Sequence, residues 1–140
     1  MNIIKKISYI VFLMFAVMLF SPAGADENLS QQASKYAPDK VYNIAKTKKI
    51  PLVMVFYADW CADSNEYMPV INEVENVRGN KIIFLKVNAE DKQNEDFVKK
   101  YNQSNKIMPR TIILKSNFEI IADFVGKKNK KELDEYLNKL

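Results

Sequence analysis

Apolar residues occur along this chain in blocks whose spacing predicts strands and helices in turn. Leu52 to Tyr57 is six apolar residues without alternation, which is typical of a strand covered on both faces. Ile82 to Val87 is predicted as a second buried strand. Two more strands are predicted at Thr111 to Leu114 and Phe118 to Val125, joined through Ser116-Asn117 as an antiparallel hairpin.

The most regular helical pattern begins soon after the first strand. Apolar residues recur three or four positions apart, as on the inward face of an amphipathic helix, at Tyr67, Val70, Ile71, Val74 and Val77. This spacing predicts a helix from about Ala62 to Val77. Pro69 lies inside it and predicts a bend, because proline removes a helical hydrogen bond.

Three further helices are predicted, each with a signal at its N-terminus. Pro38 to Lys48 begins with a proline in the first turn. Asp91 to Tyr101 begins with a capping aspartate. The last helix begins after Asn129, with Glu132 as its capping-box partner.

These elements predict one domain over residues 38–140. After the first helix their order is β-α-β-α-β-β-α, and a β-α-β unit followed by a hairpin indicates an α/β fold with a mixed sheet flanked by helices. Residues 26–37 are polar and predict a loose lead-in, with a short helical turn as the alternative.

The first 25 residues have the pattern of a secretory signal peptide. Lys5 and Lys6 precede an apolar run from Ile7 to Phe20, and Ala23-Gly24-Ala25 is a small-residue cleavage site. We expect cleavage after Ala25, a periplasmic or secreted protein, and no membrane contact afterwards. An uncleaved anchor is the alternative, although the run is shorter than the roughly 20 residues that a span requires.

Composition excludes several classes of protein. The chain has 21 Lys and Arg against 17 Asp and Glu, so loss of Lys5 and Lys6 with the signal leaves a net charge of +2. No basic stretch carries base-stacking aromatic residues, and Lys127 to Lys131 is predicted as a solvated face, so we expect no nucleic-acid partner. Without histidine and with one cysteine, the chain lacks a Cys-His protease pair and the ligands of an ordinary zinc site. We expect no metal and no cofactor.

The one cysteine lies where the first strand ends. Cys61 follows Trp60, and Ser64 comes three residues later in Trp60-Cys61-Ala62-Asp63-Ser64. A second cysteine at position 64 would make a dithiol redox centre. With serine there, Cys61 can attack a disulfide, but nothing in the chain can then close an intramolecular disulfide and release the partner.

In this setting the mature chain resembles the thioredoxin family over nearly its whole length. Leu52 to Cys61 is similar to the strand and loop that carry the family's attacking cysteine, and its Tyr-Ala-Asp-Trp-Cys stretch is similar to periplasmic members that handle reducing equivalents. Pro69 lies where the family bends the next helix. Met108-Pro109 resembles the cis-proline loop, and Phe124-Val125-Gly126 resembles the closing strand. The resemblance implies a thioredoxin-like fold.

The resemblance also implies roles around the cysteine. Trp60 would form an apolar rim for a partner peptide. Met108, before a cis Pro109, would offer its backbone edge to that peptide, with a rigid turn between helix and strand as the alternative role of Pro109. Ser64 either donates a hydrogen bond to the Cys61 thiolate or is a tolerated polar residue of the first helical turn.

Three residues depart from the family pattern. Ser64 replaces the resolving cysteine, and Val55 occupies the position of a buried acid that assists proton transfer in many members. Arg110 follows the proline where threonine is usual. Its charge is expected to point to solvent, with an approach to Cys61 or a pairing with Asp59 as alternatives.

Charges near Cys61 are expected to oppose one another. A helix N-terminus favours a thiolate. Asp59, Asp63 and Glu66 crowd the same turn, with no lysine predicted to offset them, and favour the protonated thiol. We therefore expect a thiol that is only modestly acidic.

Two functions from different classes fit these observations. The first is an exported monothiol protein that exchanges thiols and disulfides with protein or small-molecule partners, by isomerisation, adduct exchange or client capture through Cys61. The second is a redox-inactive binding or accessory module that uses the surface around Trp60 and Pro109. A homodimer linked through Cys61 is a further expectation, since a lone thiol in an oxidising compartment can pair with itself.

Overall fold

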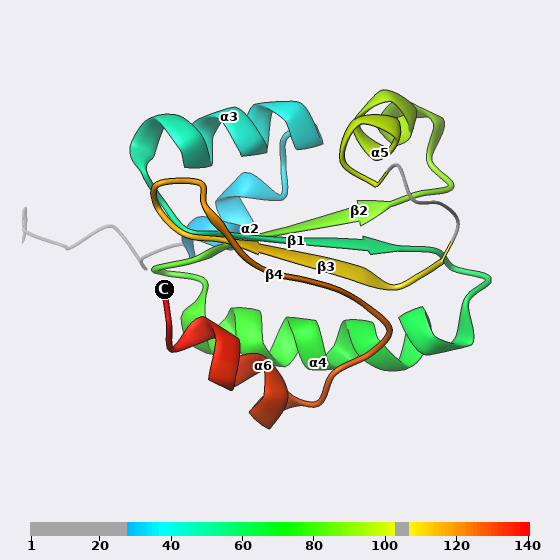
Figure 1. The fold of residues 1–140 in the computed structure, drawn as a ribbon. Helices are drawn as coiled ribbons and strands as arrows, with labels where there is room; N and C mark the ends of the chain where they lie inside the picture. Colours follow the sequence, from blue (N-terminus) through cyan, green and yellow to red (C-terminus); the bar gives the residue numbers. More distant parts are fainter. Residues whose placement is uncertain (1–27, 103–106) are drawn as a thin grey trace, which may run out of the picture.

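Four strands form the centre of the molecule in the order β2-β1-β3-β4 (Figure 1). The computed structural model describes residues 28–102 and 107–140. The strands are β1 (Leu52–Tyr57), β2 (Ile83–Asn88), β3 (Arg110–Leu114) and β4 (Ile120–Val125). β1 pairs in parallel with β2 and antiparallel with β3, and β3 pairs antiparallel with β4. The predicted mixed sheet is confirmed.

Helices cover both faces of this sheet. α3 (Pro38–Lys48) and α5 (Glu95–Tyr101) lie on one face, and α4 (Ala62–Arg78) and α6 (Lys130–Leu137) lie on the other (Figure 1). Successive residues of β1 point to opposite faces. Met54 therefore packs in the core beneath α3 and α5, and Val55 packs in the core above α4 and α6. The unbroken apolar run of β1 follows from this burial on both sides.

Most predicted elements are observed within a residue or two of their expected ends. α6 has the predicted capping box between Asn129 and Glu132. The helix predicted from Asp91 begins instead with a 3-10 turn, η1 (Lys92–Asn94), that Asp91 caps. The predicted inward position of Val77 is wrong, because this side chain, in the last turn of α4, is 70% exposed.

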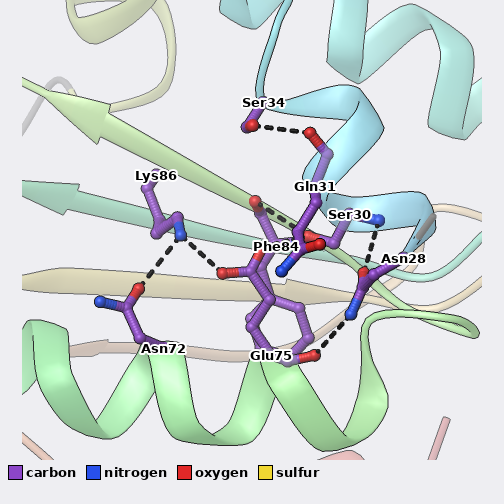
Figure 2. Close-up of polar contacts among 8 residues, drawn as sticks. All are labelled: Asn28, Ser30, Gln31, Ser34, Asn72, Glu75, Phe84 and Lys86. Atoms are coloured by element: carbon purple, nitrogen blue, oxygen red, sulfur yellow. Dashed lines mark hydrogen bonds and ion pairs between the residues drawn. The ribbon is translucent and has the colours of Figure 1, made fainter.

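The polar segment before α3 is packed against the domain. α2 (Leu29–Ala33) takes the helical alternative predicted for residues 26–37, and its Ser30 is fully buried beside β2. Ser30 Oγ donates to Glu75 Oε1 at 2.6 Å and accepts from the Phe84 N–H at 2.8 Å (Figure 2). Phe84 is in an edge strand, so Ser30 supplies the partner that a neighbouring strand would otherwise supply.

Glu75 links this segment to α4 and β2. It is 4% exposed, and its second carboxylate oxygen accepts from Lys86 Nζ at 2.5 Å (Figure 2). Asn28 Nδ2 donates to the Glu75 carbonyl oxygen at 3.1 Å, and the Asn28 side chain lies close to Gly79. A Cβ at position 79 would lie 2.1 Å from the Asn28 side chain, so this contact requires glycine. Buried polar groups are thus satisfied by partners from three elements.

The predicted signal over residues 1–25 lies outside the described residues. Within residues 28–102 and 107–140, no helix combines the length and the apolar character needed to cross a membrane.

Ser30→Ala is expected to lower the free energy of unfolding by about 2 kcal/mol, because it leaves a buried N–H and a buried carboxylate oxygen without their partner. Urea denaturation measures this change. Ser34→Ala is the matched control, since exposed Ser34 bonds only within its own segment, to the Gln31 carbonyl (Figure 2). Equal losses of unfolding free energy in Ser30→Ala and Ser34→Ala would contradict a role of Ser30 in linking α2 to α4 and β2.

Tyr67 provides a pH-dependent prediction. Burial raises the pKa of Tyr67 from its usual 10.0 to about 12, while its hydroxyl lies 3.1 Å from Thr111 Oγ1. The folded state therefore keeps this proton at a pH where the unfolded chain loses it. The stability that results is complete below about pH 10 and is lost as pH rises to about 12, a change on the order of 3 kcal/mol.

Urea unfolding at a series of alkaline pH values tests this expectation. Tyr67→Phe should flatten the alkaline loss of stability relative to the unmodified protein, whereas Tyr36→Phe, at an exposed position, should not. An unchanged slope in Tyr67→Phe would show that Tyr67 does not carry the effect.

Candidate functional site

Cys61 lies at the junction between β1 and α4, as the N-cap residue of the helix. Its N–H donates to the Ala58 carbonyl at 3.1 Å, which closes the turn that leads from strand to helix. The half-buried thiol does not cap the helix but donates to the Met108 carbonyl oxygen at 3.3 Å. The sulfur is thereby held against the loop that precedes β3.

That loop contains the predicted cis-proline. The Met108-Pro109 peptide bond is cis, and Pro109 is buried. The Pro109 carbonyl accepts from the Gly126 N–H at 2.7 Å, which ties the loop to the end of β4. Hydrogen bonds thus connect three parts of the sequence: Cys61 with Met108, and Pro109 with Gly126.

Two exposed apolar residues are next in sequence to Cys61 and Met108. Trp60, before Cys61, is 66% exposed, and Ile107, before Met108, is 60% exposed. Met108 itself is half-buried. Tyr57, the last residue of β1, is half-buried.

Ser64 faces the protein interior. It is fully buried, and its Oγ accepts a 3.4 Å hydrogen bond from the Ala58 N–H. This contact joins the first turn of α4 to the loop that carries Cys61. Val55, at the position of the family's buried acid, is also fully buried.

The expected lack of a lysine near the acidic residues is wrong. Lys127, in the loop between β4 and α6, bonds to the Glu66 carboxylate and lies 3.3 Å from Asp63 Oδ1. Hydrogen bonds to Glu66 and then Asp63 raise the pKa of Lys127 above its usual value. This pairing could not be predicted from neighbouring residues, because the partners are about sixty positions apart in the sequence and meet only in the folded chain.

Asp59 belongs to a second group of polar residues behind the Cys61 loop. Its carboxylate accepts from Asn88 Nδ2 at 3.0 Å, and its N–H donates to Glu90 Oε2 at 2.8 Å. Asn65 Nδ2 also donates to the Asp59 carbonyl at 3.0 Å. These contacts anchor the loop to the end of β2 and to α4.

Arg110 takes a partner that the sequence did not predict. It forms two hydrogen bonds with Asp123 of β4, at 2.7 and 2.8 Å, and one with Asn102 at 3.0 Å. The Asp123 carboxylate raises the pKa of Arg110, and the guanidinium lowers that of Asp123. The expected solvent position and the pairing with Asp59 are both wrong, because residues 110 and 123 lie on adjacent antiparallel strands. Arg110 instead braces the strand that follows Pro109.

Comparisons with known proteins agree with this arrangement. The chain is 28% identical over 95 residues to a thioredoxin of Bacillus subtilis (strain 168), covering 68% of this chain and 86% of that protein. It is 34% identical over 83 residues to a thioredoxin of Buchnera aphidicola, covering 59% of this chain and 72% of that protein. It is 24% identical over 136 residues to the thiol-disulfide oxidoreductase ResA of Bacillus thuringiensis, covering 78% of this chain and 79% of that protein.

A solved structure and a family model extend the comparison. Thioredoxin f2 of Chlamydomonas reinhardtii superposes with a TM-score of 0.58 at 23% identity, over 74% of this chain and 92% of that one, and so shares the fold. The thioredoxin family model matches residues 33–139. Together with the cysteine at the start of α4 and the cis-proline beside it, this match shows that the chain belongs to the thioredoxin family.

Proposed function

We propose that this protein exchanges thiols and disulfides through Cys61 alone. The Cys61 thiolate attacks one sulfur of a partner disulfide, the S–S bond breaks, and the departing thiolate takes up a proton. The product is a mixed disulfide between Cys61 and the partner. An external protein or small-molecule thiol, as its thiolate, then attacks this bond, regenerates the Cys61 thiolate and leaves with the partner as a new disulfide.

The contact between Cys61 Sγ and the Met108 carbonyl, 3.3 Å apart, carries this proposal. The sulfur lies beside the cis-proline loop, and an extended partner segment that pairs with the Met108 backbone would bring its disulfide to Cys61. The thioredoxin relatives and the relative named a thiol-disulfide oxidoreductase support the same chemical class. Two-electron reduction within one chain would require a second cysteine, and the sequence has one.

In this function Trp60 and Met108 contact the partner, and Pro109 shapes the loop that receives it. Ser64 takes the place of a resolving cysteine. Its hydroxyl oxygen accepts from the Ala58 N–H, so we assign it the role of holding the Cys61 loop against α4. Exchange without internal resolution suits isomerisation, adduct exchange or stable capture of a partner.

We also propose that this chemistry takes place after export. The basic, apolar and small-residue segments of residues 1–25 support a cleavable signal. In an oxidising compartment, partner disulfides are available to a lone thiolate. A Cys61-linked homodimer would be the resting form that a non-reducing gel detects.

Ser64→Cys tests the single-cysteine mechanism. Position 64 is one helical turn from Cys61, within reach of a disulfide. With bis(2-hydroxyethyl) disulfide as partner, the unmodified protein should accumulate one 2-mercaptoethanol adduct on Cys61. The variant should release that adduct and form an intramolecular disulfide. Intact mass spectrometry under acid quench distinguishes these products.

Two controls define the outcome. Ser116→Cys adds a thiol in the exposed β3–β4 turn, so its Cys61 adduct should persist. Cys61→Ala should form no adduct. If the unmodified protein forms no adduct, and Cys61→Ala retains partner binding, the protein is the redox-inactive binding module instead.

A further inference from the structure

The loop after β4 brings a lysine to the Cys61 site. Gly126 ends the strand with a φ of +93°, a conformation that favours glycine, and its N–H bonds to the Pro109 carbonyl at 2.7 Å. The next residue is Lys127. Lys127 therefore follows a residue that is bonded to the cis-proline loop, and the same loop contacts the Cys61 sulfur at Met108.

The side chain of Lys127 extends to the beginning of α4. Its Nζ lies 3.3 Å from Asp63 Oδ1 and bonds to the Glu66 carboxylate. Asp63 is in the first turn of the helix that Cys61 caps, and Glu66 is one turn further along the chain. The three side chains together carry a net charge of −1 at the first two turns of the helix that Cys61 caps, whereas the carboxylates alone would carry −2.

Given the exchange chemistry proposed for Cys61, on which this role rests, we propose that Lys127 is a positioning residue of the site: its ammonium offsets the Asp63 and Glu66 carboxylates and thereby favours the thiolate form of Cys61. Two uncompensated carboxylates in the same turns would oppose the negative charge that nucleophilic attack requires. The partial positive charge of the helix N-terminus would then have to offset both carboxylates without help from a lysine.

Among the described residues, three other charged side chains of this region have partners of their own. The Asp59 carboxylate is bonded to Asn88, and the Glu90 carboxylate accepts from the Asp59 N–H. Arg110 is paired with Asp123 on the β4 side of the cis-proline loop. Within residues 28–102 and 107–140, Lys127 is the cation that an ion pair joins to the first turn of α4.

A lysine elsewhere in the chain offers a matched comparison. Lys130 Nζ lies 2.6 Å from Glu73 of α4, and its side chain is as exposed as that of Lys127. Glu73, the partner of Lys130, is about two helical turns further from Cys61 than Glu66, the partner of Lys127. A general role in attaching α6 to α4 would be shared by both lysines, whereas an effect on the thiolate would belong to Lys127 alone.

Alkylation of Cys61 by iodoacetamide measures the thiolate directly, since the thiolate displaces iodide and the uncharged reagent is not steered by surface charge. At pH 7 in dilute buffer, Lys127→Gln should slow alkylation roughly two- to fivefold, the range expected for one exposed charge pair. The alkylation rates of the unmodified protein and of Lys127→Gln should converge at about pH 10, where cysteine thiols are generally ionised. The difference at pH 7 should also shrink in about 1 M salt.

Three further variants separate charge from structure. Lys127→Arg and Lys130→Gln should keep nearly the unmodified rate. Lys127→Gln combined with Glu66→Gln restores the net charge of −1 and should recover most of the lost rate. The role is overturned if Lys127→Gln matches Lys130→Gln, or if the charge-matched double variant stays as slow as Lys127→Gln.

Exchange with bis(2-hydroxyethyl) disulfide is followed on the same samples. Absence of a mixed disulfide in every variant, with the alkylation pattern intact, would reject the proposed function while leaving the effect of Lys127 on the thiolate. Adduct formation without dependence on Lys127 would reject the role of Lys127 alone.

Discussion

The antiparallel pairing of β1 with β3 is the constraint on which the site depends. Phe56 is opposite Arg110 in this register, so the end of β1 and the beginning of β3 lie side by side. The residues just beyond these ends, Cys61 and Met108, are 47 positions apart in sequence, and this pairing brings the sulfur to the Met108 carbonyl. A register shift of one residue would turn each side chain of β3 to the opposite face and separate the two loops.

The surrounding polar contacts hold the same junction from several directions. Arg110 and Asp123 join β3 to β4 directly after Pro109, and the Gly126 N–H joins the end of β4 to Pro109 itself. Asp59 attaches the Cys61 loop to the end of β2. Because these groups are hydrogen-bonded within the protein, the loops on both sides of the sulfur are held before a partner arrives, which limits the ordering cost of binding.

Much of the fold follows from local patterns in the sequence. The unbroken apolar run of β1 is typical of a strand buried on both faces, and the 3.6-residue spacing in α4 is typical of a helix buried on one face. Both patterns therefore predicted these elements well. Capping residues such as Asp91 and Asn129 act on N–H groups only a few residues away, and their roles were also predicted. The helical alternative for residues 26–37 could not be preferred from sequence, because Ser30 is satisfied by Glu75 and Phe84, which are distant in the chain.

The sequence by itself determined the chemical content of the site: one thiol at the start of a helix, a serine in place of a second thiol, and a proline before β3. Tertiary structure decided the electrostatic surroundings, since Lys127 and Arg110 find their partners through the sheet and not along the chain. Residues in local elements interact at spacings that a pattern reveals, whereas ion pairs between elements depend on strand order and register. Charge along the sequence therefore predicted an acidic turn, and the folded chain places a lysine against it.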